Sequence, residues 1–181
     1  MDYSRDIKCS NSQGGNAKIY LFPYVEYLDS EITVVDNILT AFPYNIIYDM
    51  NANNINFNID AKSDVDIEYS ENISFQLRKL SEKDKFKEYL QQDYRIIIKD
   101  NNGKIRLFGL QNGLFGSYKE DSGTNRNEFS GYSFSFEGKE ENTAPYLSDL
   151  SLFGIMNLEG LLLQDGNNNL IQDGNNNIIT N

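Results

Sequence analysis

The hairpin signal between Arg95 and Gly109 constrains the fold of this chain more than any other feature of its sequence. Two β-rich runs, 95–99 and 104–109, flank the turn sequence Asp100-Asn101-Asn102-Gly103. An Asn-Gly turn between two such runs is the strongest short-range signal for a β-hairpin. The signal therefore predicts a pair of antiparallel strands at the centre of the fold.

Two more runs downstream extend this pattern. Residues 113–118 form the first, and residues 131–138 form the second, which alternates Tyr and Phe with small or polar residues. Such alternation is typical of a strand with one buried face. We therefore predict four antiparallel strands between Tyr94 and Gly138, with the aromatic side chains in the core.

A long polar loop, Lys119–Ser130, separates the third and fourth of these runs. Two interpretations stay open for it. It is either a mobile surface loop or an arm that reaches a neighbouring subunit, because long loops in compact domains often carry function. Tyr118 and Phe129 flank the loop and are candidate intersubunit contacts.

The composition argues against an enzyme. The 181 residues, of which 39% are hydrophobic, suit one domain with additional arms. No His is present, which removes the usual general base and the commonest zinc ligand. Carboxylate pairs such as Glu140 with Glu141 can be chosen, but no pattern distinguishes them as an acid–base pair. We expect no catalytic residues, no cofactor and no bound metal.

The formal net charge of −11 disfavours tight nucleic-acid binding, which depends on clusters of Lys and Arg. An acidic surface is compatible with DNA that slides past without binding, since like charges repel. The single Cys9 cannot form an intramolecular disulfide, and no apolar run approaches the ~20 residues that span a bilayer. With no signal-peptide core after Met1, we expect folding in a reducing cytosol and no membrane insertion.

Shorter runs upstream predict further strands at 18–25, 32–39 and 44–48. Pro23 places the first of them at a sheet edge or a bend, because proline cannot donate a hydrogen bond to a strand ladder.

Residues 55–80 alternate apolar and polar positions over three runs, which predicts strands that are covered on one side only. Their polar residues would face solvent, a lumen or a neighbour. The apolar positions are Ile55, Phe57, Ile59, Val65, Ile67, Tyr69, Ile73, Phe75 and Leu77.

One short helix is expected near residues 82–92. Ser81 is a suitable N-cap, and an apolar stripe follows at Phe86, Tyr89 and Leu90. A helix of this length is not stable alone, so we expect it to pack on the sheets.

The last part of the sequence contains an internal repeat with a period of eight residues. The units Leu162–Asn169 and Leu170–Asn177 share the sequence Gln-Asp-Gly-Asn-Asn-Asn, and Ile178-Ile179 follows. Each unit is a short apolar strand before an Asp-Gly turn, and the resulting meander is too small to be stable alone. It is expected to dock on the domain or on another subunit. The candidate contacts are Leu162, Leu163, Leu170, Ile171, Ile178 and Ile179.

These patterns divide the chain into an N-terminal arm (1–17), a β-rich core (18–147) and a C-terminal extension (148–181). The Asp-Gly turns at Asp165 and Asp173 resemble fragments of calcium loops. Neither has the bidentate Glu of an EF-hand, and turn formation explains both without a metal.

Several short motifs resemble small structural tail or neck proteins of phages that infect Bacteroidetes-type bacteria, including the crAss-like group. They are Cys9-x-x-x-x-Gly14-Gly15 with Ile19-Tyr20-Leu21, Asn102–Gly109 with Asn112-Gly113, Gly131–Gly138, Ala144-Pro145 and the C-terminal repeat.

This resemblance implies a tail-tube-like fold, which is an antiparallel β-sandwich or barrel with one packed helix. It also implies six-fold or twelve-fold rings around the DNA path, in contact with neighbouring tail or portal-side virion proteins. The location would be the virion tail, after assembly in the host cytoplasm. The alternative is a receptor- or carbohydrate-binding β-sandwich module of a tail tip.

Overall fold

The computed structural model describes residues 15–50, 52–63, 67–78, 92–122 and 129–157. Within these ranges the chain is mainly β, as predicted, and its strands form two sheets. A 3-10 turn, η1, covers Asp29–Glu31. The helix expected near 82–92 falls almost entirely on residues 79–91, outside the described part of the chain.

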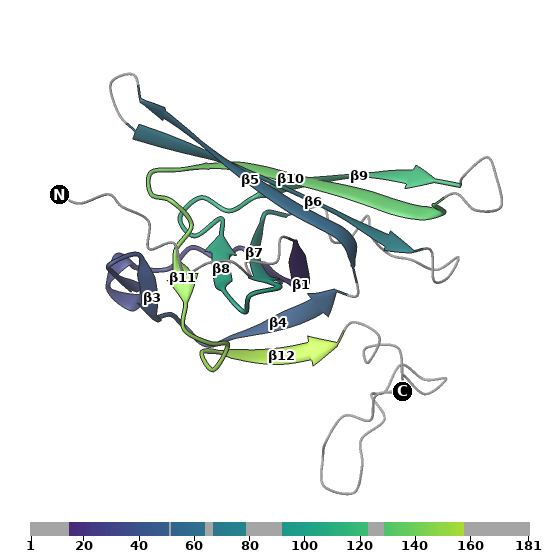
Figure 1. Cartoon of the computed structure of the whole chain (residues 1–181). Coiled ribbons are helices and arrows are strands. Elements are labelled where there is room, and N and C mark those ends of the chain that lie inside the picture. Colours follow the sequence, from purple (N-terminus) through teal and green to yellow (C-terminus); the bar gives the residue numbers. More distant parts are fainter. Residues whose placement is uncertain (1–14, 51, 64–66, 79–91, 123–128, 158–181) are drawn as a thin grey trace, which may run out of the picture.

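The strands follow one another closely along the sequence (Figure 1). Their bounds are β1 Asn16–Pro23, β2 Thr33–Val35, β3 Ile38–Ala41, β4 Asn45–Met50, β5 Asn53–Ser63, β6 Ile67–Arg78, β7 Tyr94–Asp100, β8 Ile105–Phe108, β9 Phe115–Asp121, β10 Gly131–Glu140, β11 Tyr146–Leu147 and β12 Phe153–Asn157.

The larger sheet has eight strands in the order β12-β4-β1-β7-β8-β11-β3-β2 and curls into a half-barrel. Two of its pairs, β12 with β4 and β11 with β3, are parallel. The expectation of a purely antiparallel fold is therefore wrong for this sheet, because the chain after β10 returns to it through crossovers rather than hairpins.

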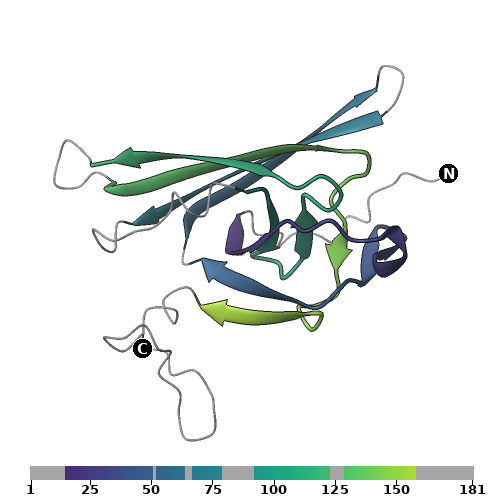
Figure 2. The same ribbon diagram turned by 180° about the vertical axis from the view of Figure 1, so that it is seen from behind.

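The smaller sheet has four strands in the order β5-β6-β10-β9, and all of its pairs are antiparallel. In Figures 1 and 2, β9 and β10 extend past the half-barrel at one end, and β5 and β6 rise away from it at the other.

The predicted hairpin is confirmed as the antiparallel pair β7–β8. In its turn, the Asp100 carboxylate accepts hydrogen bonds from the N–H groups of Asn102 and Lys104, both at 2.8 Å. Gly103 has a φ of +83°, which a residue without Cβ adopts at little cost.

The four strands between Tyr94 and Gly138 are divided between the sheets, which the sequence did not predict. β7 and β8 belong to the larger sheet, whereas β9 and β10 belong to the smaller one. The third strand is also longer than expected, because Asp121 still pairs with Gly131. The first residues of the predicted 119–130 loop are therefore strand.

Two upstream predictions need correction. β1 is a central strand between β4 and β7, not an edge, because Pro23 is its last residue and the missing N–H falls at the end of the ladder. The run 32–39 is not one strand. Asp36 and Asn37 have φ values of +50° and +62°, so they turn the chain between β2 and β3.

Two clusters of buried residues fill the molecule. The first lies between the sheets and includes Ile96 and Ile98 from β7 together with Phe75 and Phe134 from the smaller sheet. The second fills the concave side of the half-barrel and includes Ile97, whose side chain points the opposite way from those of its neighbours. β7 therefore has two buried faces.

The alternation predicted for the runs 55–59, 73–77 and 131–138 is confirmed, whereas residues 68–70 of the middle run are all partly buried. Phe75, Phe134 and Phe136 are buried, whereas Asn72 and Ser135 are exposed. The aromatic side chains of these strands thus form core, as expected.

The larger sheet also extends past residue 147, where the core was expected to end. β12 pairs with β4, and Phe153 is buried against Phe22 and Phe42.

Candidate assembly surface and the polar joint beside it

The face of the smaller sheet that points away from the core is polar. Directly opposite residues in neighbouring strands share a face, and the register sets Asn56, Ser74, Ser135 and Ser117 in one row across all four strands. All four residues are exposed. The half-barrel lies on the other side of this sheet, and no described element covers the polar face (Figure 2).

Charged residues on this polar face occur in balanced numbers. The acidic ones are Asp60, Glu68, Asp121 and Glu137, and the basic ones are Lys62, Arg78, Lys119 and Lys139. Lys139 Nζ lies 2.8 Å from Glu68 Oε1. The described part of this face therefore has no excess of either sign, although the whole chain has a net charge of −11.

Both edges of the smaller sheet are free of a neighbouring strand within the described residues. β5 pairs only with β6, and β9 pairs only with β10. Near the start of β5, the carbonyl of Ile55 accepts a hydrogen bond of 3.0 Å from the Asn16 side chain. Long uncovered edge strands are uncommon in monomers, because they offer backbone groups to other chains.

One large apolar side chain lies at the β9 edge. Phe115 is 60% exposed and shares the polar face with Glu137 on β10. Its strand has no second strand neighbour among the described residues.

The connection from β8 to β9, residues 109–114, crosses from one sheet to the other. Arg95 on β7 holds it from the half-barrel: its Nε and Nη2 donate to the Leu110 carbonyl at 3.1 and 3.0 Å, and its Nη1 donates to the Val25 carbonyl at 2.8 Å. The guanidinium lies 4.3 Å from the centroid of the Tyr24 ring. These hydrogen bonds and the contact with the Tyr24 ring offset the cost of burying the guanidinium charge, since Arg95 is only 1% exposed.

Glu140, at the end of β10, holds the same connection from the smaller sheet. Its two carboxylate oxygens accept hydrogen bonds from the N–H groups of Gln111 at 2.8 Å and Asn112 at 3.0 Å. The Tyr24 hydroxyl donates to the Gln111 carbonyl. Burial raises the pKa of Glu140, while these backbone donors and Arg95 oppose that shift.

Glu71 on β6 is the third buried charged group at this joint, and it is 1% exposed. Its Oε2 accepts a hydrogen bond of 2.8 Å from the Gly109 N–H, whereas its Oε1 has no hydrogen-bond partner. Burial raises the pKa of Glu71 to about 7, and the Gly109 N–H opposes the shift. We call Glu71, Arg95 and Glu140 the polar joint, because each binds the backbone that links the two sheets.

A cleft of about 850 Å³ opens beside the polar joint and is lined by all three of its residues. Tyr69 and Glu141 also line it. The hydrogen bonds of Arg95 and Glu140 go to backbone groups. In this structure these two side chains therefore hold the connection between the sheets in place.

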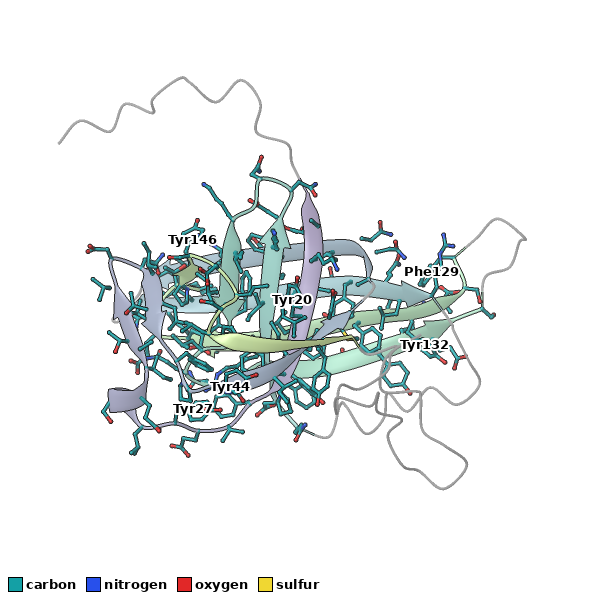
Figure 3. The ribbon with its side chains drawn as sticks, turned by 90° about the horizontal axis from the view of Figure 1, so that it is seen from below. Tyr20, Tyr27, Tyr44, Phe129, Tyr132 and Tyr146 are labelled. Atoms are coloured by element: carbon teal, nitrogen blue, oxygen red, sulfur yellow. The ribbon has the colours of Figure 1, made fainter. Side chains whose placement is uncertain are left out.

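Two of the candidate intersubunit contacts, Tyr118 and Phe129, lie among the described residues. Phe129 lies on the opposite side of the molecule from Tyr27 and Tyr44 (Figure 3). The Tyr118 ring packs on Phe134 at 5.8 Å between centroids and is partly buried, so at least part of it is core within the chain. Phe129 is half-buried. The other six, from Leu162 to Ile179, lie outside the described residues.

The free edges and the polar joint were not predicted from the sequence. A signal for the joint existed: Glu71 occupies an apolar-face position in the alternation of β6, and Glu140 does so in β10. A charged residue on the buried face of a strand requires a partner inside the fold.

The described residues contain no group of three or more His, Cys, Asp or Glu side chains that could hold a metal ion. Among them, no helix has the length and apolar character needed to cross a bilayer. Comparison with protein-family profiles, with curated protein sequences and with solved structures finds no match to this chain.

Proposed function

We propose that this protein is a structural subunit of a phage tail or neck that assembles into a ring around the DNA-ejection channel. The observation that carries the proposal is the smaller sheet, which combines two free edge strands with a polar face that no described element covers. The resemblance to virion tail proteins and the β-sandwich arrangement are consistent with it.

The free edges explain how copies would associate. β5 of one copy pairs with β9 of the next, and this head-to-tail contact leaves a free edge on each side until the ring closes. The contact would cover Phe115. Six or twelve copies would give the ring symmetries implied by the resemblance, and further virion proteins would stack on the ring.

The polar face would then line the channel. Its rows of Asn and Ser and its balanced charges provide no cluster of Lys and Arg that would hold phosphates. DNA therefore passes along it without specific binding. In this proposal the protein acts by self-association in the virion, without catalysis.

The test is the mass of the purified chain by light scattering, with negative-stain images of any large species. Wild type is expected to form closed rings, and Phe115→Glu is expected to reduce the assembled fraction about tenfold, because a charge enters the edge contact. The matched control is Leu28→Glu, since Leu28 is 70% exposed and lies in neither edge. Rings that form equally well with Phe115→Glu would rule out the β5–β9 contact.

The cleft beside the polar joint favours a second candidate, a receptor- or carbohydrate-binding module of a tail tip. Its volume of about 850 Å³ and the presence of Tyr69 among its lining residues suit a small polar ligand. A chain that remains monomeric and binds defined glycans on an array would support this candidate over the ring.

A further inference from the structure

The cleft beside the polar joint lies where the inward face of the smaller sheet changes from apolar to acidic. On β6, Ile73 is buried in the first core, whereas Glu71 and Tyr69, the next residues along the same face, line the cleft. On β10, Phe136 pairs with Ile73 in the core, and Glu140 pairs with Tyr69 at the cleft. The inward rows of both strands therefore lead from the core to a wall that carries carboxylates.

The other side chains around the cleft add to this negative charge. Glu26 and Asp29, from the segment between β1 and β2, are exposed lining residues, and so is Glu141, directly after β10. Arg95 is the only basic residue among the described lining residues, and its guanidinium already donates to backbone carbonyls. The described lining therefore has a clear excess of acidic groups.

Glu71 is the acidic group with the least compensation. It is 1% exposed, and its Oε1 has no hydrogen-bond partner among the described residues. Buried polar atoms ordinarily have such a partner. Arg106 attracts the carboxylate from outside the cleft, but this attraction is the smallest of the influences on the pKa of Glu71. A positive group in the cleft would supply what this carboxylate lacks.

We propose that the cleft binds a small organic cation with N–H donors, such as an alkylammonium group, close to Glu71 and between the acidic walls. The excess of carboxylates attracts a cation, and a buried carboxylate does so more strongly than an exposed one because little water screens it. The neighbouring rings already accept a cation, since the Arg95 guanidinium lies 4.3 and 5.1 Å from the centroids of Tyr24 and Tyr27.

A metal ion fits the cleft less well than an organic cation. Within the described residues no three Asp, Glu, Cys or His side chains are grouped so that they could hold a metal. The carboxylates are instead distributed around a volume of about 850 Å³, which suits a larger ligand.

The inference does not depend on the proposed ring, because none of the described lining residues belongs to β5 or β9. It narrows the second candidate function, since it selects a positively charged ligand over a neutral glycan. Ring assembly is measured by particle mass and cation binding by titration, so the failure of one proposal is distinguishable from the failure of the other.

An NMR titration of the full chain with n-butylammonium chloride tests the inference. It is carried out at pH 8, above the pKa of about 7 of Glu71, so that this carboxylate is ionised. The backbone amides of Gln111, Asn112 and Glu141 line the cleft and are expected to shift in a saturable manner. The neutral probe n-butanol has a similar size and should produce no such shift.

Three variants rank the contributions of the carboxylates. Glu71→Gln should weaken binding of n-butylammonium at least about tenfold, because a poorly screened charge is lost. Asp29→Asn should weaken it only about twofold, because Asp29 is exposed and its charge is screened by salt. The matched control is Glu137→Gln, which removes the same charge from the opposite face of β10 and should leave binding unchanged.

The pKa of Glu71, followed by carboxyl carbon NMR, provides a second measurement. Binding of n-butylammonium should lower this pKa, because a ligand that prefers the ionised carboxylate must also favour its ionisation. The absence of saturable shifts in wild type, an equal response to n-butanol, or unchanged affinity in Glu71→Gln would overturn the proposal. A stronger response to calcium chloride at equal ionic strength would assign the cleft to a metal ion and contradict it.

Discussion

The two sheets of this molecule differ in how many of their faces are buried. In β7 of the larger sheet, Ile96, Ile97 and Ile98 are all at most 2% exposed, although they point alternately into two cores. In β10 of the smaller sheet, Phe134 is buried and its neighbour Ser135 is exposed. The comparison shows a difference in packing: the larger sheet supplies most of the core, whereas the described residues leave one face and two edges of the smaller sheet uncovered. The proposed ring would use that face and those edges.

Between the two sheets, the polar joint fixes the distance and direction of the connection. Arg95 reaches it from the larger sheet, and Glu71 and Glu140 reach it from the smaller sheet. Buried charges that bind backbone groups are costly to remove, because the backbone partners are then left without hydrogen bonds. We therefore expect the relative placement of the sheets to be sensitive to these three residues.

The largest expected effect tests the difference in burial directly. Ile97→Ala should lower the free energy of unfolding by about 3 kcal/mol, since it leaves a cavity in the second core. Ser135→Ala, in a strand of the other sheet, should change it by no more than ~0.5 kcal/mol. Denaturant unfolding measures both. A large loss for Ser135→Ala would mean that the polar face is covered within the monomer, which would break the comparison.

A pH-dependent effect of intermediate size should come from the polar joint. The pKa of Glu71 is raised from 4.5 to about 7 in the folded chain, so the folded state binds more protons than the unfolded state between these values. Its contribution to stability is complete below pH ~4.5 and is lost as the pH rises through about 7. The loss should amount to about 3 kcal/mol at most, because one pKa unit corresponds to ~1.4 kcal/mol.

Glu71→Gln isolates this contribution, because its side-chain oxygen can still accept the Gly109 N–H but no longer titrates. The difference in unfolding free energy between variant and wild type should grow in favour of the variant from pH 5 to pH 8. Glu137→Gln, on the exposed face, is the matched control and should show no such trend. If the free energies of unfolding of Glu71→Gln and wild type changed equally with pH, the raised pKa of Glu71 would be contradicted.

The smallest effect is expected on the polar face. Lys139 pairs with Glu68 at 2.8 Å, but the two side chains are 70% and 45% exposed. Lys139→Gln should therefore cost no more than ~0.5 kcal/mol of stability, and added salt should reduce even that difference. A larger cost in dilute monomer would show that this face contributes to the stability of the folded monomer, contrary to the difference between the two sheets.

Local signals in the sequence predicted the parts of the fold that depend on neighbouring residues. The Asn102-Gly103 turn predicted the β7–β8 hairpin, and alternation predicted the one-sided burial of β6 and β10. The turn at Asp36-Asn37 was also present in the sequence, but the run 32–39 was interpreted as one strand. Of the eight intersubunit contacts predicted from the sequence, only Tyr118 and Phe129 lie among the described residues.

Strand alternation and turn chemistry are local, so the amino-acid sequence is sufficient to locate most strands of the described chain and their apolar residues. The folded arrangement was needed to show that β8 and β9 belong to different sheets and that β12 joins β4 in parallel. It was also needed to show that Glu71, Arg95 and Glu140 lie at the same connection. Strand order and such meetings depend on contacts between residues far apart in sequence, and these follow from the packing of two cores rather than from any local pattern.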